Sequence, residues 1–353
     1  MNSVNETIST QAAKGPAARS SRSPRHQPEQ EKPAADWNQV TEIARRHLHH
    51  FVTLEPKVLQ GNDLDAIHDF RVASRRLQQI LDLLYPTPRP KRIRKLRRVI
   101  RRSRRLLSTV RNCDVLIQLV DAALARKNLG QRESWRAFKE HLVSLRSESF
   151  PVAVDKLSKL NLSAFYLSLQ EYLDATPQAS GDTQEPISDQ SPTPNVKGPG
   201  EFPRNVARAL QEIWDALAAQ VASAGDAGAA PSLHAVRIAA KRLRYLVEVI
   251  RDLGAPQSEK ILHQLRRLQQ LLGDWHDLEV MEEMMAEMVA RPAFLRSNLD
   301  LAMKMERLML KNQKRKTVCE NKYFQATSDS GAWSRLEKRV SELCSNQEIG
   351  NTE

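Results

Sequence analysis

A helical segment that occurs twice constrains the fold of this chain more than any other feature. Residues 66–85 read AIHDFRVASRRLQQILDLLY, and residues 233–250 read LHAVRIAAKRLRYLVEVI. At about 100° per residue, each segment has an apolar face and, opposite it, a basic face. The basic faces correspond at an offset of 166 positions, with His68, Arg71, Arg75 and Arg76 matching His234, Arg237, Lys241 and Arg242. Because both faces repeat, we expect the two halves of the chain to build one anion site together.

The duplication continues into a second helix. LLSTVRNCDVL at 106–116 aligns with LLGDWHDLEVM at 271–281 at an offset of 165, so that Arg111 corresponds to His276 and Asp114 to Glu279. Two helices in the same order are therefore duplicated, which predicts an all-α protein of two pseudo-symmetric helical bundles with a basic groove or pore between them. The composition agrees, since the chain has only 12 glycines and 5% aromatic residues.

Composition also divides the chain into regions. Residues 1–35 are polar and predict a disordered tail, residues 175–203 are rich in proline and predict a linker, and residues 325–353 predict a polar C-terminal tail. The two bundles are then expected at about 36–174 and 204–324. The helices expected outside the duplicated pair cover 37–59, 91–126, 131–147, 152–173, 205–222, 259–272, 278–290, 292–324 and, more briefly, 333–344.

Positive charge is concentrated in one helical segment. The chain carries 54 Lys and Arg against 42 Asp and Glu, a formal charge of +12, which indicates a polyanionic partner. Residues 91–105 read KRIRKLRRVIRRSRR, and their like-charge pairs four apart cost about 1 to 2.5 kcal/mol in all. Such a helix needs anions or acidic neighbours. We expect its groove-facing members, and their counterparts in the second half, to be Arg98, Arg101, Arg102, Arg105, Arg266 and Arg267.

Other classes of site have weaker signals. The three cysteines form no CxxC pair, which argues against a disulfide framework or a zinc site. His47, His49 and His50 are interpreted as surface histidines. The acids at 114, 274, 277 and 279 are interpreted as helix-start residues that stabilise the dipole, and the methionines of MEEMMAEM at 281–288 as core. No catalytic residue, metal ligand or cofactor is expected. Because no stretch of 18 apolar residues and no secretory signal occurs, a cytoplasmic protein is expected.

Three motifs together resemble the CHAD family, the conserved histidine α-helical domain. They are HxxRVxxRRL at His68, HxxRxxxKRLRY at His234 and LLGDWHDLEV at Leu271. The resemblance covers about residues 37–324. It implies two helical bundles around a basic groove that binds inorganic polyphosphate, and association with polyphosphate granules. Carried over by position, the implied anion contacts are His68, Arg71, Arg75, His234, Arg237, Lys241 and Arg242. In one departure, Asn112 stands where the second copy has Asp277.

Two other functions compete with polyphosphate binding. Net charge and the arginine-rich helix alone would also suit a nucleic-acid-binding protein, although few aromatic residues are available for base stacking. A metal-dependent phosphohydrolase would need a carboxylate cluster beside the basic face, and some relatives carry a triphosphatase domain with an ExExK motif. That motif is absent from this sequence. We therefore expect a non-enzymatic polyphosphate-binding protein.

Overall fold

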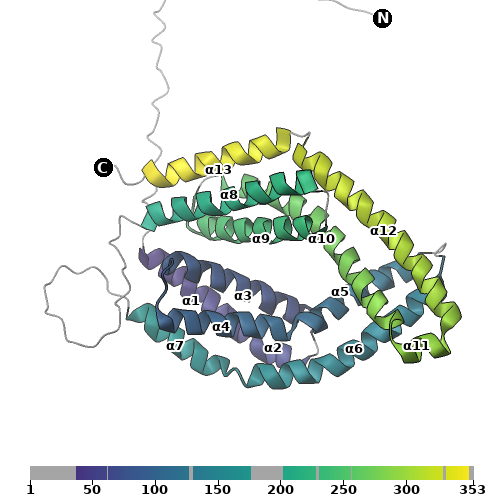
Figure 1. Cartoon of the computed structure of the whole chain (residues 1–353). Coiled ribbons are helices and arrows are strands. Elements are labelled where there is room, and N and C mark those ends of the chain that lie inside the picture. Colours follow the sequence, from purple (N-terminus) through teal and green to yellow (C-terminus); the bar gives the residue numbers. More distant parts are fainter. Residues whose placement is uncertain are drawn as a thin grey trace, which may run out of the picture. The chain divides into compact units, whose positions relative to one another are not determined.

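The computed structural model describes residues 37–61, 63–126, 130–175, 202–227, 230–255, 257–328 and 331–349, and contains no strand in these ranges. This confirms the all-α prediction (Figure 1). The tail expected at 1–35 and nearly all of the linker expected at 175–203 lie outside the described residues. The helices are α1 (Trp37–Thr53), α2 (Glu55–Gln60), α3 (Leu64–Leu84), α4 (Lys91–Leu106), α5 (Ser108–Leu124), α6 (Arg132–Ser158), α7 (Leu162–Asp174), α8 (Phe202–Ala227), α9 (Ala230–Asp252), α10 (Ser258–Val289), α11 (Pro292–Ser297), α12 (Leu299–Ser328) and α13 (Gly331–Ile349).

Helix α3, the first copy of the duplicated helix, has clear signals at both ends. At its start, the Asp63 carboxylate accepts hydrogen bonds from the backbone N–H groups of Asp65 at 2.8 Å and Ala66 at 3.3 Å. Its end at Leu84 precedes the prolines at 86, 88 and 90, which cannot continue a helix. The apolar face expected for this segment is fully buried, at Phe70, Ala73, Leu77, Leu81 and Leu84.

The largest errors in the predicted boundaries concern α6 and α10. Helix α10 is continuous from Ser258 to Val289, so Gly273 lies within it and does not join two helices. Likewise, α6 runs without a break through Pro151 to Ser158, whereas separate helices were expected at 131–147 and 152–173. One glycine costs a helix about 1 kcal/mol relative to alanine and one proline about 3, and packing along long helices outweighs both.

The interpretation of four acids as helix-start residues was therefore wrong. Asp274, Asp277 and Glu279 lie in the middle of α10, and Asp114 is in the second turn of α5. Asp114 is buried and forms an ion pair with Arg146 of α6. The dipole of a helix acts within its first and last turns, so it does not account for these side chains.

Two buried cores hold the helices together, and both combine helices from the two halves of the sequence. The larger core includes α1, α3 and α7 from the first half and α8, α9, α10 and α13 from the second. The smaller core packs α5 and α6 against α10 and α12, and Met281, Met284, Met285 and Met288 are buried within it. The methionines are therefore core, as expected. The pseudo-symmetry of two bundles stays a prediction.

The described residues of the tail expected at 325–353 are helical, since α12 ends at Ser328 and α13 covers Gly331–Ile349. Helix α13 extends beyond the short helix expected at 333–344, and it packs against α8 in Figure 1. The rings of Trp333 and Trp214 stack with centroids 5.1 Å apart. Leu336, Val340 and Leu343 of α13 are at most 3% exposed. This helix therefore contributes to the larger core. None of the described helices combines the length and the apolar character that a bilayer span requires.

Candidate functional site

The two copies of the duplicated helix, α3 and α9, pack against each other. Each also packs against the helix that follows it in the chain, α3 against α4 and α5, and α9 against α10. In the second half, the buried Gln269 amide donates to the Ala240 carbonyl at 2.8 Å, which aligns α10 with α9. In the first half, an Arg71 Nη1–H donates to the Arg104 carbonyl. These contacts bring the basic faces of both copies close together.

Five cations from both halves form what we call the basic cluster: Arg71, Arg75, Arg104, Arg237 and Lys241. Arg75 links the cluster electrostatically, because its charge lowers the pKa of each of the other four members. The buried Tyr245 lies beside the cluster. Four of the five residues were expected at one site from the duplicated pattern: Arg71, Arg75, Arg237 and Lys241. Arg104 was not expected at the site.

Electrostatics in the basic cluster are unfavourable in the absence of an anion. Burial, followed by the charges of Arg237, Arg75 and Arg244, lowers the pKa of Lys241 to about 7. Burial and neighbouring arginines also lower the pKa values of Arg71 and Arg104 to about 10. Asp277 partly compensates for this positive charge. Its own pKa is raised, because burial outweighs the effect of Arg237 and Lys241. The cluster thus carries more positive than negative charge.

Several guanidinium donors at the cluster also lack acceptors. Arg104 Nη1, Arg111 Nη1 and Arg237 Nε are buried and make no hydrogen bond within the described part of the chain. A buried unpaired donor costs about 1 to 3 kcal/mol, more when it is charged. Oxygen-rich anions provide the acceptors that such donors require.

The two duplicated histidines lie on exposed positions beside the cluster. His68 Nδ1 is 3.0 Å from Arg111 Nη2 and accepts its hydrogen bond, so this nitrogen carries no proton. Burial and Arg111 lower the pKa of His68, and burial and Arg237 lower that of His234. The His234 ring lies 5.4 Å from the ring of His276. Burial and Arg237 lower the pKa of His276 to about 3.

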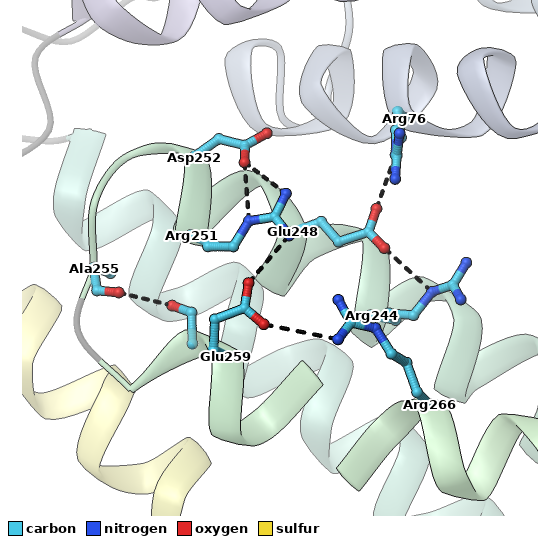
Figure 2. Close-up of polar contacts among 9 residues, drawn as sticks. Arg76, Arg244, Glu248, Arg251, Asp252, Ala255, Glu259 and Arg266 are labelled. Atoms are coloured by element: carbon cyan, nitrogen blue, oxygen red, sulfur yellow. Dashed lines mark hydrogen bonds and ion pairs between the residues drawn. The ribbon is translucent and has the colours of Figure 1, made fainter. Parts of the chain in front are cut away.

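Arg76 and Arg266, both expected as anion contacts, are paired with acids (Figure 2). Arg76 Nε donates to the buried Glu248 carboxylate at 2.9 Å and so joins α3 to α9, while Arg244 lies 3.4 Å from the other oxygen of Glu248. Arg266 lies 3.7 Å from Glu259, an acid that Arg251 also contacts. These two arginines are therefore less available to an external anion than the basic cluster is.

Helix α4 supplies a second concentration of arginines. A cavity of about 450 Å³ is lined by Thr87, Pro88, Arg89, Arg94, Arg97, Arg98 and Arg101. Asp82 of α3 is 2.6 Å from Arg97 and 3.4 Å from Arg89, so part of this charge is compensated. The neighbouring cavity of about 340 Å³ contains Asp82 and Arg242. Arg98 and Arg101 are exposed, and the charge of Arg101 acts on Arg104 of the basic cluster.

The remaining predicted residues are less closely connected to the cluster. Arg102, Arg105 and Arg267 are exposed, and the charge of Arg105 lowers the pKa of Arg104. His49 and His50 are exposed, as expected, but His47 is half-buried. Burial and then Arg76 lower the pKa of His47 to about 4.

Sequence reasoning missed four residues at the site: Arg104, Arg111, Asp277 and Tyr245. Arg111 and Asp277 fall inside the second duplicated stretch, so the same alignment that pointed to α3 and α9 contained a signal for them. Arg104 lies within a run of arginines, and the sequence pattern alone does not show which of them face the site.

The comparisons with known proteins agree with this architecture. The family model of the CHAD domain matches residues 42–286. The chain belongs to the CHAD family. The crystal structure of the CHAD domain from the plant Ricinus communis has a TM-score of 0.59 and 21% sequence identity, covering 88% of this chain and 92% of that one. PptA from Streptomyces chartreusis has a TM-score of 0.56 and 14% identity, covering 86% and 100%. A comparison with curated protein sequences finds no match.

These likenesses support a shared fold at low sequence identity. The CHAD match includes α3, α4, α9 and most of α10, and therefore all members of the basic cluster. Helices α11, α12 and α13 lie beyond the matched residues.

Proposed function

We propose that this CHAD protein binds inorganic polyphosphate through the basic cluster. The observation that carries the proposal is the set of buried guanidinium donors without acceptors, contributed by both halves of the chain to one cation-rich cluster. A phosphate chain has closely spaced negative oxygens and no bases to be recognised. Arginine suits it, because the guanidinium group stays charged and donates two parallel hydrogen bonds.

The second part of the proposal concerns the path of a long chain. The α4 cavity with Arg98 and Arg101 lies next to Arg104, since the charge of Arg101 acts on that residue. A polyphosphate chain held at the basic cluster would extend along these arginines. The histidines at 68 and 234 would contact or orient the anion at the exposed side of the cluster.

A charge-matched pair of variants tests the site. The cluster variant changes Arg71, Arg75 and Arg237 to Gln, and the control variant changes Arg136, Arg296 and Arg307, which are exposed on α6, α11 and α12, to Gln. Long-chain polyphosphate is titrated into both and into the wild type at two salt concentrations, and circular dichroism checks the folding. We expect the polyphosphate affinity of the cluster variant to fall by roughly tenfold or more. The affinity of the control variant should fall by less than about threefold.

Equal losses in the two variants would instead assign the affinity to diffuse positive charge. In that case nucleic acid becomes the leading alternative, and competition between polyphosphate and duplex DNA at fixed salt tests it directly. We expect polyphosphate to displace DNA.

We further propose binding without hydrolysis. Incubation with polyphosphate and Mg²⁺ or Mn²⁺ should release no phosphate above the rate without protein. Release that depends on both metal and protein would favour the phosphohydrolase alternative. In cells, a fluorescent fusion should collect on polyphosphate granules, and the cluster variant should not.

A further inference from the structure

A cavity of about 610 Å³ lies where α5, α6, α10 and α12 come together, the four helices whose residues form the smaller core. A volume of this size is typical of sites for small organic molecules. The basic cluster contributes none of its five residues to the described lining. One wall is α12, which lies beyond the residues matched by the CHAD family model. The cavity is therefore a site separate from the basic cluster.

Apolar side chains from all four helices line the cavity. Leu119 and Ala122 of α5 are exposed to solvent, whereas Trp135 of α6, Met281 of α10 and Leu308 of α12 are buried and belong to the smaller core. A ligand that covers this surface removes apolar area from water. The lining therefore favours a molecule with an apolar body over an inorganic ion.

Three cations of the lining stand in a row along α12. Lys311, Arg315 and Lys322 are separated by four and seven residues, so at about 100° per residue they fall within about 40° of one another around the helix. Among the ion pairs of the described residues, none includes these three, whereas Lys304 and Lys316 of the same helix are paired with acids at 2.8 and 2.7 Å. The row is therefore available to an external anion.

Two carboxylates of α10 balance only part of this charge. Asp274 and Asp277 line the cavity, and Asp277 also acts on Arg237 and Lys241 of the basic cluster. The cations of the lining, which are the α12 row and Arg126, outnumber these two acids. The net charge of the cavity is therefore positive, which suits an organic anion.

The cavity wall also includes buried acceptors that lack donors. Asn312 of α12 lines the cavity and is 2% exposed. Its amide nitrogen donates to the Leu278 carbonyl at 2.8 Å and to Glu282 at 3.1 Å, so the orientation of the amide is fixed. Its Oδ1 and the Oε1 of Gln131 are buried and accept no hydrogen bond from the described residues. A ligand with N–H donors would satisfy these oxygens.

We propose that this cavity binds a nucleoside monophosphate. The flat base would contact the apolar side chains, and its amino or ring N–H groups would donate to the amide oxygen of Asn312. The phosphate would accept charge-assisted hydrogen bonds from the α12 row. A fatty acid has an apolar body and a negative charge but no donor for the amide oxygens, and inorganic phosphate has no apolar body.

Calorimetric titration of the full chain with three probes, in the absence of polyphosphate, tests the proposal. Adenosine monophosphate has both the base and the phosphate, ribose 5-phosphate lacks the base, and adenosine lacks the phosphate. We expect adenosine monophosphate to bind at one site and each fragment to bind more weakly by roughly tenfold or more. If adenosine monophosphate shows no binding up to about 1 mM, or if ribose 5-phosphate binds equally well, the proposal is wrong.

Two variants of the lining place the ligand in the cavity. Lys311→Gln with Arg315→Gln removes two members of the α12 row, and Ala122→Trp fills the cavity from an exposed position. Each should lower the affinity for adenosine monophosphate by roughly tenfold or more. The matched control is Arg307→Gln with Lys314→Gln, two exposed cations of the same helix outside the lining, which should keep the wild-type affinity. Unchanged binding in Ala122→Trp would overturn the proposal.

The cluster variant, with Arg71, Arg75 and Arg237 changed to Gln, separates this site from the proposed polyphosphate site. We expect its affinity for adenosine monophosphate to stay within about twofold of the wild type, whatever its affinity for polyphosphate. If the cluster variant loses adenosine monophosphate binding while Lys311→Gln with Arg315→Gln retains it, the nucleotide occupies the basic cluster and the cavity is not its site.

Discussion

At the scale of single residues, the pKa of Lys241 reflects both burial and the positive charge around it. Its ammonium group is surrounded by Arg75 from α3 and by Arg237 and Arg244 from its own helix, while Asp277 of α10 supplies negative charge. Burial and these neighbours lower its pKa to about 7, so the residue is about half protonated near neutral pH. A polyanion bound at the cluster would stabilise the charged form and raise this pKa again.

We therefore predict that polyphosphate binding takes up protons. Above pH 7 the free protein holds Lys241 mostly neutral, and binding protonates it, so affinity should fall as pH rises from about 7 toward the ordinary lysine pKa of 10.5. Calorimetry at pH 8.5 in two buffers of different ionisation enthalpy measures the uptake. Burial lowers the pKa values of His68 and His234, so the free histidines stay neutral at this pH and Lys241 is the group that the measurement addresses.

The control is Lys241→Met, which keeps the length of the side chain and removes the titrating group. We expect proton uptake at pH 8.5 to fall markedly in this variant. If the wild type has the same polyphosphate-binding enthalpy in both buffers, no proton is taken up and the prediction is wrong.

At the scale of the helix, two glycines have opposite roles. Gly273 lies within α10, and a Cβ atom built there meets nothing within 4 Å. Gly61 follows α2 with a φ of +71°, and a Cβ atom there would lie 2.5 Å from the Phe150 ring. Only the second position requires glycine.

Substitution by alanine should therefore have opposite effects at the two sites. Gly273→Ala is expected to stabilise the protein by about 0.5 to 1 kcal/mol, because alanine loses less backbone entropy in a helix. Gly61→Ala is expected to destabilise it by at least about 1 kcal/mol through the left-handed backbone. Urea unfolding measures both. A destabilising Gly273→Ala would argue that α10 bends or breaks at this residue.

The contact between α3 and α9 depends on a buried acid. Glu248 is 6% exposed and pairs with Arg76 and Arg244, whereas Glu171 pairs with Arg92 at 2.7 Å and is 71% exposed in its side chain. Glu248→Gln should cost about 1.5 to 3 kcal/mol in the free energy of unfolding, because it leaves the partly buried guanidinium groups of Arg76 and Arg244 without a charged partner. The matched Glu171→Gln should cost less than about 1 kcal/mol. Similar costs in urea unfolding would mean that solvent reaches Glu248.

Some of these elements could be predicted from sequence and others could not. The period of α3 and its capping aspartate are local signals, and both α3 and its buried face were predicted. The continuity of α10 through Gly273 depends on tertiary packing, which no local pattern contains. At the site, the duplicated pattern pointed to Arg71 and Arg237. The pairing of Arg76 with Glu248 depends on the α3 to α9 contact and was not predictable.

For the whole molecule, the C-terminal helix belongs to the larger core although it lies beyond the family match. Val340 of α13 is fully buried, and Trp333 stacks on Trp214 of α8. Removal of the residues after Ser328 would expose to water the surfaces of α8 and α10 that α13 contacts.

We predict that this truncation lowers the thermal unfolding midpoint by about 10 °C or more, because the burial of each large apolar side chain contributes about 1.5 to 3 kcal/mol. Differential scanning calorimetry measures the change. Lys338→Ala, on the exposed face of the same helix, should leave the midpoint nearly unchanged. If the truncated chain unfolds at the same temperature as the full chain, α13 is not part of the cooperative unit.

The shared smaller core has a consequence for synthesis on the ribosome. Phe138 and Leu142 of α6 share the smaller core with Met281, Met285 and Leu308, which are translated more than a hundred residues later. At a translation rate of about 5 to 20 residues per second, the nascent first half waits several seconds or longer with this apolar surface open to solvent. The first half of the chain therefore completes its folding only after its partner helices emerge, and in that interval it is a natural client for chaperones.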